Sequence, residues 1–491
     1  VVGAYRAEHP VFGSLVQSGA AYIYEKNSSG NWAQIQKIQP QAPSDQERDF
    51  GWSVSISGNY IIVGCPGALK DANGLNQIAG GGNLGVGAAF IFKRNTNGVW
   101  EEVQKLVASD RASSDQFGLA VDISGTKAII GACYEDEDEF GGNTKDYAGS
   151  AYIFECSSNG NWNEVQKIVS SDRDLHNKFG WSVSIEQNYA IVGAIWENSN
   201  IANNGFGGHE GAVYVYKRQN SGYWNEIQKV KHSDVEWMDH FGYSVSLSGN
   251  YFVAGAPKNP NDNLGLNHIS EAGAAYIFKK NNFGTFDQTQ KIVASDRSLE
   301  DSFGEQVDIS GNNIIIGVPQ EDHNSNGGNY MSTAGSIYIF NKNISGNWSQ
   351  THKEVAFDRS TGDGFGWGLA ISATDIIIGA PSEDHDVSGG NYMKNAGSVY
   401  ILGECFHTNN TINETSCNSY TSPSGIVYSN SGTYTDIINN STGCDSIITI
   451  NLIIHNPSSI TINETSCNSY TSPSGVIYSN SGTYTDIINN S

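Results

Sequence analysis

Carboxylates are concentrated in three stretches of this sequence where they could bind a cation or a ligand. The densest stretch contains Glu135, Asp136, Asp138 and Glu139. Oxygen-rich loops hold hard cations such as Ca²⁺, so this stretch predicts a metal site. Two similar pairs predict ligand-binding loops: Glu321-Asp322 and Glu383-Asp384. The alternative, which we favour, is an Asx-type turn in which each acid accepts hydrogen bonds from its own loop backbone.

Tryptophan is the second residue type that could bind a ligand, because its indole ring can stack on a sugar. Trp196 and Trp237 follow no repeat and fall in loop-like stretches, so we expect them on a binding surface. Trp52, Trp181 and Trp367 instead each follow a Phe-Gly pair directly. For these three we expect packing between repeated units, with a lectin-like surface as the alternative.

Sequence motifs for catalysis are absent. There is no G-x-S-x-G, no H-E-x-x-H and no C-x-x-C, and the 11 His show no triad or zinc-ligand spacing. An acidic residue does recur in every unit, and we expect this series to accept backbone hydrogen bonds between units: Asp110, Asp172, Asp234, Asp296 and Asp358. We therefore expect no catalytic residues and no enzyme. A secreted carbohydrate-active or other enzyme is the alternative.

Composition limits the partners and the fold class. The 491 residues contain 27 Lys and Arg but 51 Asp and Glu, a formal net charge of −24. This balance argues against nucleic acids and anionic membrane surfaces as partners. No run approaches the roughly 18 apolar residues of a membrane helix, so no membrane insertion is expected. The chain is rich in Gly and Tyr and poor in charge, which indicates an all-β protein of short strands and tight turns.

A repeat of 62 residues organises most of the chain. The pair Phe-Gly recurs at positions 50, 117, 179, 241, 303 and 365, with a first spacing of 67 and four of 62. Each unit contains four strand-like runs, of which the first two are separated by a tight turn such as Ser248-Gly249-Asn250. Four antiparallel strands per repeated unit predict a β-propeller. A flat array or solenoid is the alternative.

The strand motifs predict seven blades. The second and third strand motifs each occur seven times, whereas the Phe-Gly strand and the fourth strand each occur six times. We therefore expect the chain to begin inside its first blade. On this interpretation, about 30 residues upstream of Val1 would supply the two missing strands and close the ring.

The paired motifs resemble the FG-GAP repeat of the integrin α-subunit propeller and of many bacterial surface proteins. Phe241-Gly242 with Gly255-Ala256-Pro257 carries the resemblance, as does Phe365-Gly366 with Gly379-Ala380-Pro381. It covers residues 1–404 and implies a ligand-binding or adhesion module. The family often carries a calcium loop between these two strands, but here the connection is only a short turn. No cofactor is therefore assigned, and Ca²⁺ stays open only for the acidic loops.

A different repeat follows the predicted propeller. Residues 411–441 recur almost unchanged at 461–491, so we expect one small β-sandwich-like module at 405–460 and a truncated copy at 461–491. Cys417 lies 27 residues before Cys444, and we expect these two to form a disulfide in an oxidising location. Two reduced, buried thiols are the alternative. Because the second copy stops before its matching cysteine, we expect the native protein to continue.

This second repeat resembles extracellular repeats of Bacteroidota surface proteins, which implies export by type IX secretion. The resemblance rests on the segments Cys-Asn-Ser-Tyr, beginning at Cys417, and Gly-Cys-Asp-Ser, beginning at Gly443. Together the two modules predict a propeller head on a repetitive stalk at the cell surface. The partner expected for it is a cell-surface protein or a glycan, and assembly into a homo-oligomeric, multi-chain appendage is a further expectation.

Overall fold

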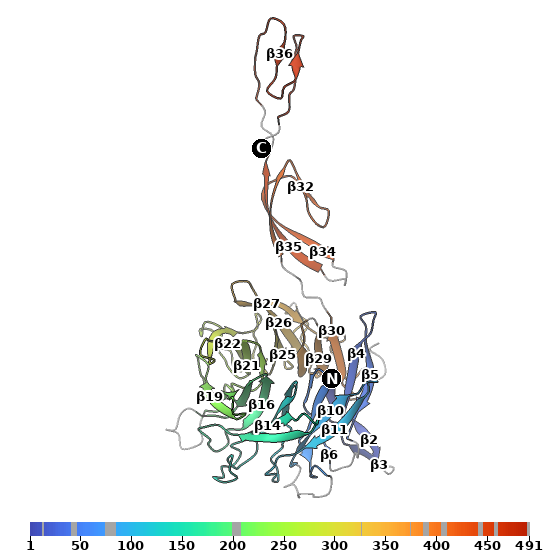
Figure 1. Ribbon diagram of the computed structural model, residues 1–491, viewed down its shortest axis with the longest axis vertical. Helices are drawn as coiled ribbons and strands as arrows, with labels where there is room; N and C mark the ends of the chain where they lie inside the picture. The colour runs from blue at the N-terminus through green and yellow to red at the C-terminus, as the bar shows by residue number, and fades with distance from the viewer. Residues whose placement is uncertain are drawn as a thin grey trace. The chain divides into compact units, whose positions relative to one another are not determined.

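The computed structural model describes residues 1–491 except 12–13, 41–46, 74–84, 199–207, 326, 374, 386–391, 404–409, 440–444, 456–459 and 489–491. The chain divides into two compact units, Val1–Gly403 and Glu404–Ser491. All regular secondary structure in the described residues is β-strand, which confirms the predicted all-β class (Figure 1).

Unit Val1–Gly403 consists of seven antiparallel sheets, here called blades 1–7 in chain order. A complete blade has four strands in sequential order, here called first to fourth. Blade 2 contains β7 (Val54–Ser57), β8 (Tyr60–Cys65), β10 (Ala88–Arg94) and β11 (Trp100–Leu106). Blade 3 contains β12 (Ala120–Ser124), β13 (Lys127–Ala132), β14 (Ser150–Cys156) and β15 (Trp162–Ile168). Blade 4 contains β16 (Phe179–Glu186), β17 (Tyr189–Ala194), β18 (Ala212–Arg218) and β19 (Trp224–Val230).

The remaining blades follow the same pattern, but the two terminal ones have three strands. Blade 5 contains β20 (Val245–Ser248), β21 (Tyr251–Ala256), β22 (Ala274–Lys280) and β23 (Phe286–Ile292). Blade 6 contains β24 (Gln306–Ser310), β25 (Asn313–Val318), β26 (Ser336–Lys342) and β27 (Trp348–Glu354). Blade 1 contains β1 (Val2–Ala4), β4 (Ala20–Lys26) and β5 (Trp32–Ile38), in the second to fourth positions. Blade 7 contains β28 (Gly368–Ile371), β29 (Ile376–Ala380) and β30 (Ser398–Leu402), in the first to third positions.

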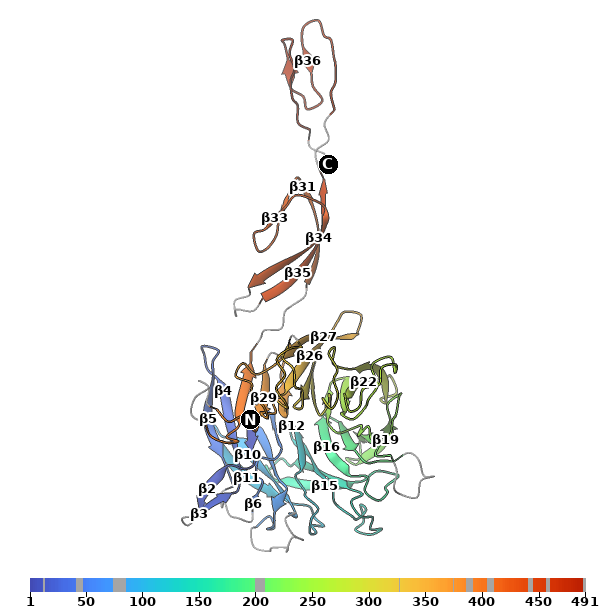
Figure 2. The same ribbon diagram turned by 180° about the vertical axis from the view of Figure 1, so that it is seen from behind.

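Two short two-stranded sheets accompany these blades: the hairpin of β2 (Glu8–Val11) with β3 (Ser14–Gln17), and the antiparallel pair of β6 (Glu47–Arg48) with β9 (Gly67–Ala68). First strands of neighbouring blades lie side by side, as β12 does with β16 and β20 with β24. Blade 7 meets blade 1 through an ion pair of 3.0 Å between Lys26 and Asp375, and β30 lies beside β4 in both views (Figures 1 and 2). This circular arrangement of four-stranded sheets is a β-propeller.

Burial explains the sequence of each strand. Second and third strands are buried on both faces and are therefore almost continuously apolar, as in the Lys127–Ala132 and Ser150–Cys156 runs. Fourth strands alternate between inward and exposed side chains, as in Trp162–Ile168. Serine and aspartate in the first strands join neighbouring blades: Ser55 Oγ donates to Asp122 at 2.7 Å, and Ser246 Oγ donates to Asp308 at 2.6 Å.

The Phe-Gly pair connects each blade to the preceding one. Phe179 is fully buried and packs edge-on against Tyr214 in its own blade, with ring centroids 5.4 Å apart. Its backbone pairs with Gly149 at the start of the third strand of blade 3. A methyl group on Gly131 in blade 3 would overlap the backbone of Gly180, so the close approach of the two blades requires glycine there. The same pairing occurs at six junctions, which explains the period of the motif.

Unit Glu404–Ser491 contains a three-stranded sheet and two hairpins. The central strand β35 (Asp445–His455) pairs in parallel with β31 (Asn410–Cys417) and antiparallel with β34 (Gly432–Asn439). The hairpins are β32 (Tyr420–Thr421) with β33 (Val427–Tyr428), and β36 (Tyr470–Thr471) with β37 (Ile477–Tyr478). The core of the sheet contains alternate residues of β35: Ile448, Ile450, Leu452 and Ile454.

The predicted Cys417–Cys444 disulfide involves one described residue. Cys417 is an exposed free thiol, and its backbone pairs in register with His455 of β35. Cys444 lies outside the described residues, so the disulfide stays a prediction.

Candidate functional site

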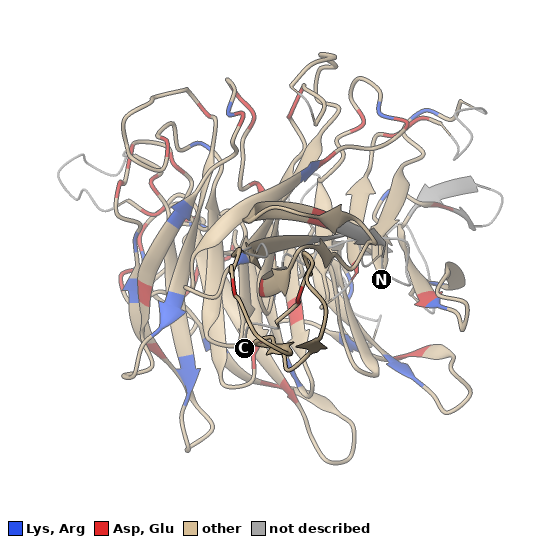
Figure 3. Ribbon diagram, turned by 90° about the horizontal axis from the view of Figure 1, so that it is seen from above, with Lys and Arg blue, Asp and Glu red and all other residues tan. Residues whose placement is uncertain are grey.

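Long loops gather at one end of the blades, and we call this end the loop face. Within a blade, the first strand begins at the end where the second strand stops, as the pairing of Phe179 with Ala194 shows. The connections from second to third strands and from fourth strands to the next blade therefore both lie at this end. Tight turns occupy the other end of the strands. Figure 3 marks Asp and Glu residues in red on several of the longer loops. The predicted acids and tryptophans therefore have to be assessed on the loop face.

Each complete blade from 3 to 6 has a buried polar network under this face. In blade 3, Tyr152 Oη donates to Asp110 Oδ1 at 2.8 Å, and Lys167 Nζ donates to Asp110 Oδ2 at 2.6 Å. Lys167 also forms an ion pair with Glu135, whose side chain is 1% exposed. Ser150 Oγ donates to Glu135 at 2.7 Å. The lysine ammonium thus compensates two carboxylates within the blade.

The network repeats every 62 residues and corrects one expectation. The Asp110 series accepts hydrogen bonds from a tyrosine hydroxyl in every case and from a lysine in four, rather than from backbone N–H groups alone. The tyrosines are Tyr152, Tyr214, Tyr276, Tyr338 and Tyr400. The lysines are Lys167, Lys229, Lys291 and Lys353. Both series have the same period as the aspartates, so the sequence contained the signal.

The four acids of the predicted metal site do not converge. Asp136 accepts the backbone N–H of Tyr147 at 2.6 Å, and Asp138 accepts those of Phe140 at 2.9 Å and Gly142 at 3.0 Å. All three hydrogen bonds come from the backbone of the loop itself, as in the favoured turn interpretation. Glu135 lies in the buried network, and Glu139 is exposed.

The residues that do come together near Glu135 are a different set. Among the described residues, one group of three potential metal ligands has ligand atoms within 4.8 Å of one another: Asp110, Glu135 and Glu137. Lys167 already pairs with Asp110 and Glu135 and offsets one of their two negative charges. Three carboxylate groups, two of them bound to this lysine, fall short of the 6–8 oxygen ligands of calcium, so this set does not fit the metal site predicted for the acidic stretch.

The predicted ligand-binding acids also contact their own blades. Glu321 is buried and accepts from Tyr338 Oη at 2.8 Å, while Asp322 accepts the backbone N–H of Thr333 at 2.6 Å. Glu383 is fully buried, and Asp384 accepts the backbone N–H of Asn395. The structure thus places one acid of each pair inside the blade and the other in a loop turn.

Trp196, by contrast, lies in an aromatic cluster on the loop face at the junction of blades 3, 4 and 5. Lys178 Nζ lies 3.6 Å from the centre of the Trp196 ring, 4.5 Å from that of Tyr134 and 5.3 Å from that of Trp181. Trp196 stacks on His209 with centroids 4.8 Å apart. We call Tyr134, Lys178, Trp181, Trp196, His209, His240 and Tyr243 the Lys178 cluster. Ligand-binding sites commonly combine aromatic walls with few polar groups in this way.

The Lys178 cluster has little charge beyond its lysine. Burial lowers the pKa of Lys178 and that of His209, and burial together with the neighbouring His209 lowers the pKa of His240 to about 4. Both imidazoles are therefore neutral at neutral pH. Trp181 and Trp196 are partly exposed, so a ligand can stack on their rings. The buried ammonium of Lys178 beside them supplies a single positive charge.

Other large apolar side chains are exposed in loops of the loop face. Trp237 is 70% exposed. Trp52 and Trp367 are 47% and 53% exposed, more than packing between blades would leave. Loops of blades 3, 5, 6 and 7 add further exposed residues: Phe140, Leu264, Leu266, Tyr330, Tyr392 and Met393. Exposed apolar residues gathered on one face often mark an interaction surface.

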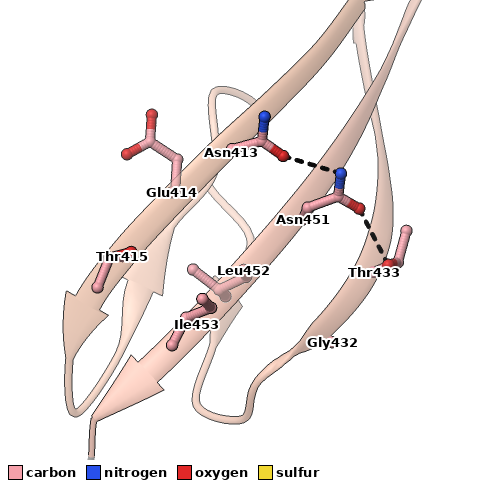
Figure 4. Close-up of a pocket in the computed structure, with 8 residues that line it drawn as sticks. All are labelled: Asn413, Glu414, Thr415, Gly432, Thr433, Asn451, Leu452 and Ile453. Carbon is pink, nitrogen blue, oxygen red and sulfur yellow. Dashed lines mark hydrogen bonds between the residues drawn. The ribbon is translucent and has the colours of Figure 1, made fainter.

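A shallow groove of about 300 Å³ lies on the sheet of the second unit (Figure 4). Asn451 Nδ2 donates to Asn413 Oδ1 at 2.9 Å, and Thr433 Oγ1 donates to Asn451 Oδ1 at 3.0 Å, so a polar ladder crosses the three strands. Its amide and hydroxyl groups already pair with one another. The groove is therefore a weaker candidate for ligand binding than the Lys178 cluster.

Comparison with protein families assigns the first unit. The model of the FG-GAP repeat matches six segments that together exceed half of the chain: residues 32–92, 100–154, 162–216, 224–278, 286–340 and 348–402. The chain therefore belongs to the FG-GAP repeat family, and its first unit is an FG-GAP β-propeller. Each matched segment begins at the fourth strand of one blade and ends with the third strand of the next, so the family unit contains a blade junction.

More distant comparisons add little. A crystal structure of a protein from Lactobacillus plantarum matches 78% of this chain and 94% of its own, with 10% identity and a TM-score of 0.44. A likeness at this level carries no functional information. Curated proteins give no match. Across the described residues, there is no helix with the length and apolarity that a membrane crossing requires.

Sequence reasoning named Trp196 and Trp181 but missed the other members of the Lys178 cluster. Tyr134, Lys178 and His209 come from three separate segments and do not recur at the 62-residue period, so a search for repeats passes over them. The signal for these three residues is a departure from the repeat. At these positions, blades 3 and 4 carry side chains that the other blades lack.

Proposed function

We propose that this chain is an extracellular binding or adhesion module, in which the loop face of the propeller binds a cell-surface protein or a glycan. The tandem repeats of the second unit would carry the propeller at the cell surface, in a chain exported by type IX secretion. We also propose that it acts without catalysis. Assembly of several chains into an appendage is compatible with this role.

The Lys178 cluster is the observation that carries the proposal. Stacked rings with adjacent exposed tryptophan suit the apolar faces of sugar rings or the side chains of a protein partner. One ammonium 3.6 Å from Trp196 adds a positive centre for a carboxylate or a polarised hydroxyl group. The buried acids of the blades already pair with lysine or backbone donors in blades 3, 4 and 6, which argues against a catalytic pair of carboxylates there.

The test measures binding of the full chain to a glycan array and to intact bacterial and host cells. We expect Trp196→Ala and Trp237→Ala to weaken binding at least about tenfold, as for aromatic residues at the centre of an interface. Ile344→Ala is the matched control, because Ile344 is fully exposed in a turn at the other end of the blades. Equal binding by all three variants would contradict the proposal.

A second arm of the test addresses metal dependence. Because Lys167 compensates Asp110 and Glu135, we expect binding to be unchanged when a chelator is added. Loss of binding with chelator, restored by Ca²⁺, would move the binding site to a calcium-dependent surface elsewhere. Hydrolysis of a glycan on the array would contradict the non-enzymatic role.

A further inference from the structure

One lysine and three carboxyl groups lie together inside blade 3. The side chains of Lys167 and Glu135 are only 5% and 1% exposed. Lys167 Nζ donates to Asp110 Oδ2 at 2.6 Å and also contacts the carboxylate of Glu135. Glu137 adds the third carboxyl group, and one oxygen of each acid lies within 4.8 Å of the others. Burial, together with the neighbouring Glu135, raises the pKa of Glu137, so this cluster favours an additional proton.

The two oxygens of Asp110 have different partners. Oδ2 faces Lys167, whereas Oδ1 accepts the hydroxyl group of Tyr152 at 2.8 Å. Tyr152 is fully buried and packs edge-on against Phe117, with ring centroids 5.3 Å apart. Such apolar surroundings disfavour separated charges, so a proton can move from the ammonium to the carboxylate along their hydrogen bond. The resulting neutral amine is a nucleophile, and the protonated carboxyl group beside it is an electrophile.

We propose that Lys167 and Asp110 condense into an isopeptide bond, a covalent modification within blade 3. After the proton has moved from Nζ to Oδ2, the amine attacks Cγ of Asp110 and the Nζ–Cγ bond forms. Tyr152 Oη stabilises the negative charge that develops on Oδ1. Glu135 accepts a proton from Nζ and delivers it to Oδ2. The Cγ–Oδ2 bond then breaks and one water molecule leaves, so the step needs no further reactant.

This bond joins two segments that are 57 residues apart in the chain. Asp110 precedes the first strand of blade 3, and Lys167 belongs to its fourth strand, β15. The other three strands of the blade therefore lie within the closed loop. A cross-link of this kind restricts the unfolded chain and so stabilises the folded one. The bond acts inside the blade, so it does not depend on the proposed role of the loop face.

The equivalent groups in blades 4 and 5 lack part of this arrangement. In blade 4, the side chains of Lys229 and Asp172 are 27% and 44% exposed, so water stabilises their charged forms. In blade 5, Asn259 occupies the position of Glu135. An amide group does not exchange a proton as a carboxylate does, so the transfer from nitrogen to oxygen has no carrier there.

Blade 6 is the nearest counterpart, since Lys353 and Glu321 are buried as well. There, however, Tyr338 Oη donates to Glu321 at 2.8 Å, and Lys353 Nζ lies 3.2 Å from the same carboxylate. His323 stands in the place of Glu137, with its Nδ1 3.2 Å from Glu321. The third acid is thus missing, and the glutamate already has other donors. Of blades 3 to 6, we expect the bond in blade 3 alone.

The experiment measures the mass of the intact full chain after denaturation and reduction. We expect a mass lower than the sequence requires by that of one water molecule. Tryptic digestion should then yield a branched peptide that joins residues 106–111 to residues 146–173, because trypsin does not cleave after an acylated lysine. Lys167→Met and Glu135→Gln should both have the full sequence mass. Glu321→Gln is the matched control in blade 6 and should keep the deficit.

Three results would overturn the proposal. The first is a wild-type mass equal to that of the sequence, a result that needs no variant to fold. The second is a deficit carried by an unbranched peptide, as a cyclised aspartate would produce. The third is a deficit that persists in Lys167→Met or in Glu135→Gln.

Discussion

Two kinds of blade junction occur in this molecule, and they differ although Gly255 corresponds to Gly379 and Glu321 corresponds to Glu383. At the junction of blades 5 and 6, Gly255 touches the backbone of Gly304, and Lys353 of blade 6 joins Asp296 to Glu321. At the junction of blades 7 and 1, the nearest atom to a methyl group on Gly379 would be 3.7 Å away. Glu383 there has no lysine among its described contacts.

This difference shows that a repeated residue has no fixed energetic value. Glu321 and Glu383 occupy equivalent positions, yet one is paired with an ammonium and the other is buried with an unpartnered oxygen. A buried carboxylate stabilises a fold only while its charge and hydrogen bonds are compensated. The same substitution in two blades should therefore have effects of different size, and in one case of opposite sign.

The largest effect is expected from removing a lysine of an interior network. Lys353→Met leaves Asp296 and Glu321 uncompensated in a site where the lysine side chain is 4% exposed. Breaking a buried pair in this way costs about 3–5 kcal/mol of unfolding free energy. Thermal and urea denaturation, followed by circular dichroism, measure the loss.

The control for this prediction is the double variant Lys353→Met with Glu321→Gln. Removing both charges should restore part of the loss, as expected for residues that interact directly. If Lys353→Met leaves the denaturation midpoint unchanged, the network is not what stabilises the blade.

Glycine at the blade junctions gives the next effect. Gly255→Ala would force a methyl group into the carbonyl group of Gly304, and the two backbones would have to separate. We expect a loss of about 1–3 kcal/mol or more, as for overpacking in a close-packed core. Gly379→Ala is the matched control, because its methyl group meets no atom within 3.4 Å. We expect the unfolding free energy of this variant to stay within about 0.5 kcal/mol of wild type. Equal effects of the two variants would show that the junctions do not differ in packing.

The third effect is a reversal of sign between equivalent acids. Glu321→Gln removes the partner of Lys353 and should lower stability by about 1–2 kcal/mol. Glu383→Gln removes an uncompensated buried charge and keeps an oxygen to accept the backbone N–H of His385, so it should raise stability by about 1 kcal/mol. Thermal melting curves of the two variants, measured in parallel, test this difference in sign. A loss of stability in both variants would contradict the prediction.

The fold was more predictable than the contacts within it. The Phe-Gly pairs and the buried apolar runs predicted the propeller because each blade requires them. The spacing of the Phe-Gly pairs along the chain is therefore the spacing of the blade junctions. The partners of Asp110 were mispredicted because a side-chain network was not sought, although Tyr152 and Lys167 recur with the same spacing. The count of six fourth strands against seven third strands did indicate an incomplete blade, but it could not show that Glu383 is buried there.

The second unit shows the limit of local sequence more clearly. Residues 411–417 form most of strand β31, whereas the identical residues 461–467 form no strand. The first copy pairs with β35, and the second has no corresponding strand in the described residues. A strand needs its partner, so sequence identity alone does not determine structure. The parallel pairing of β31 with β35 was likewise not visible in the sequence.

The smallest effect should be a pH dependence that is centred on blade 7. Burial, with the adjacent Glu383, raises the pKa of Asp363 to about 7 from an ordinary value of 3.8. The folded protein therefore keeps a proton that the unfolded chain releases, so the unfolding free energy falls as pH rises from about 4 to about 7. We expect Asp363→Asn to match wild type near pH 4 and to exceed it by on the order of 1–2 kcal/mol at pH 8, since water at the open edge screens part of the charge. A difference between variant and wild type that is the same at both pH values would show that Asp363 is ionised throughout and that blade 7 does not hold an uncompensated acid pair.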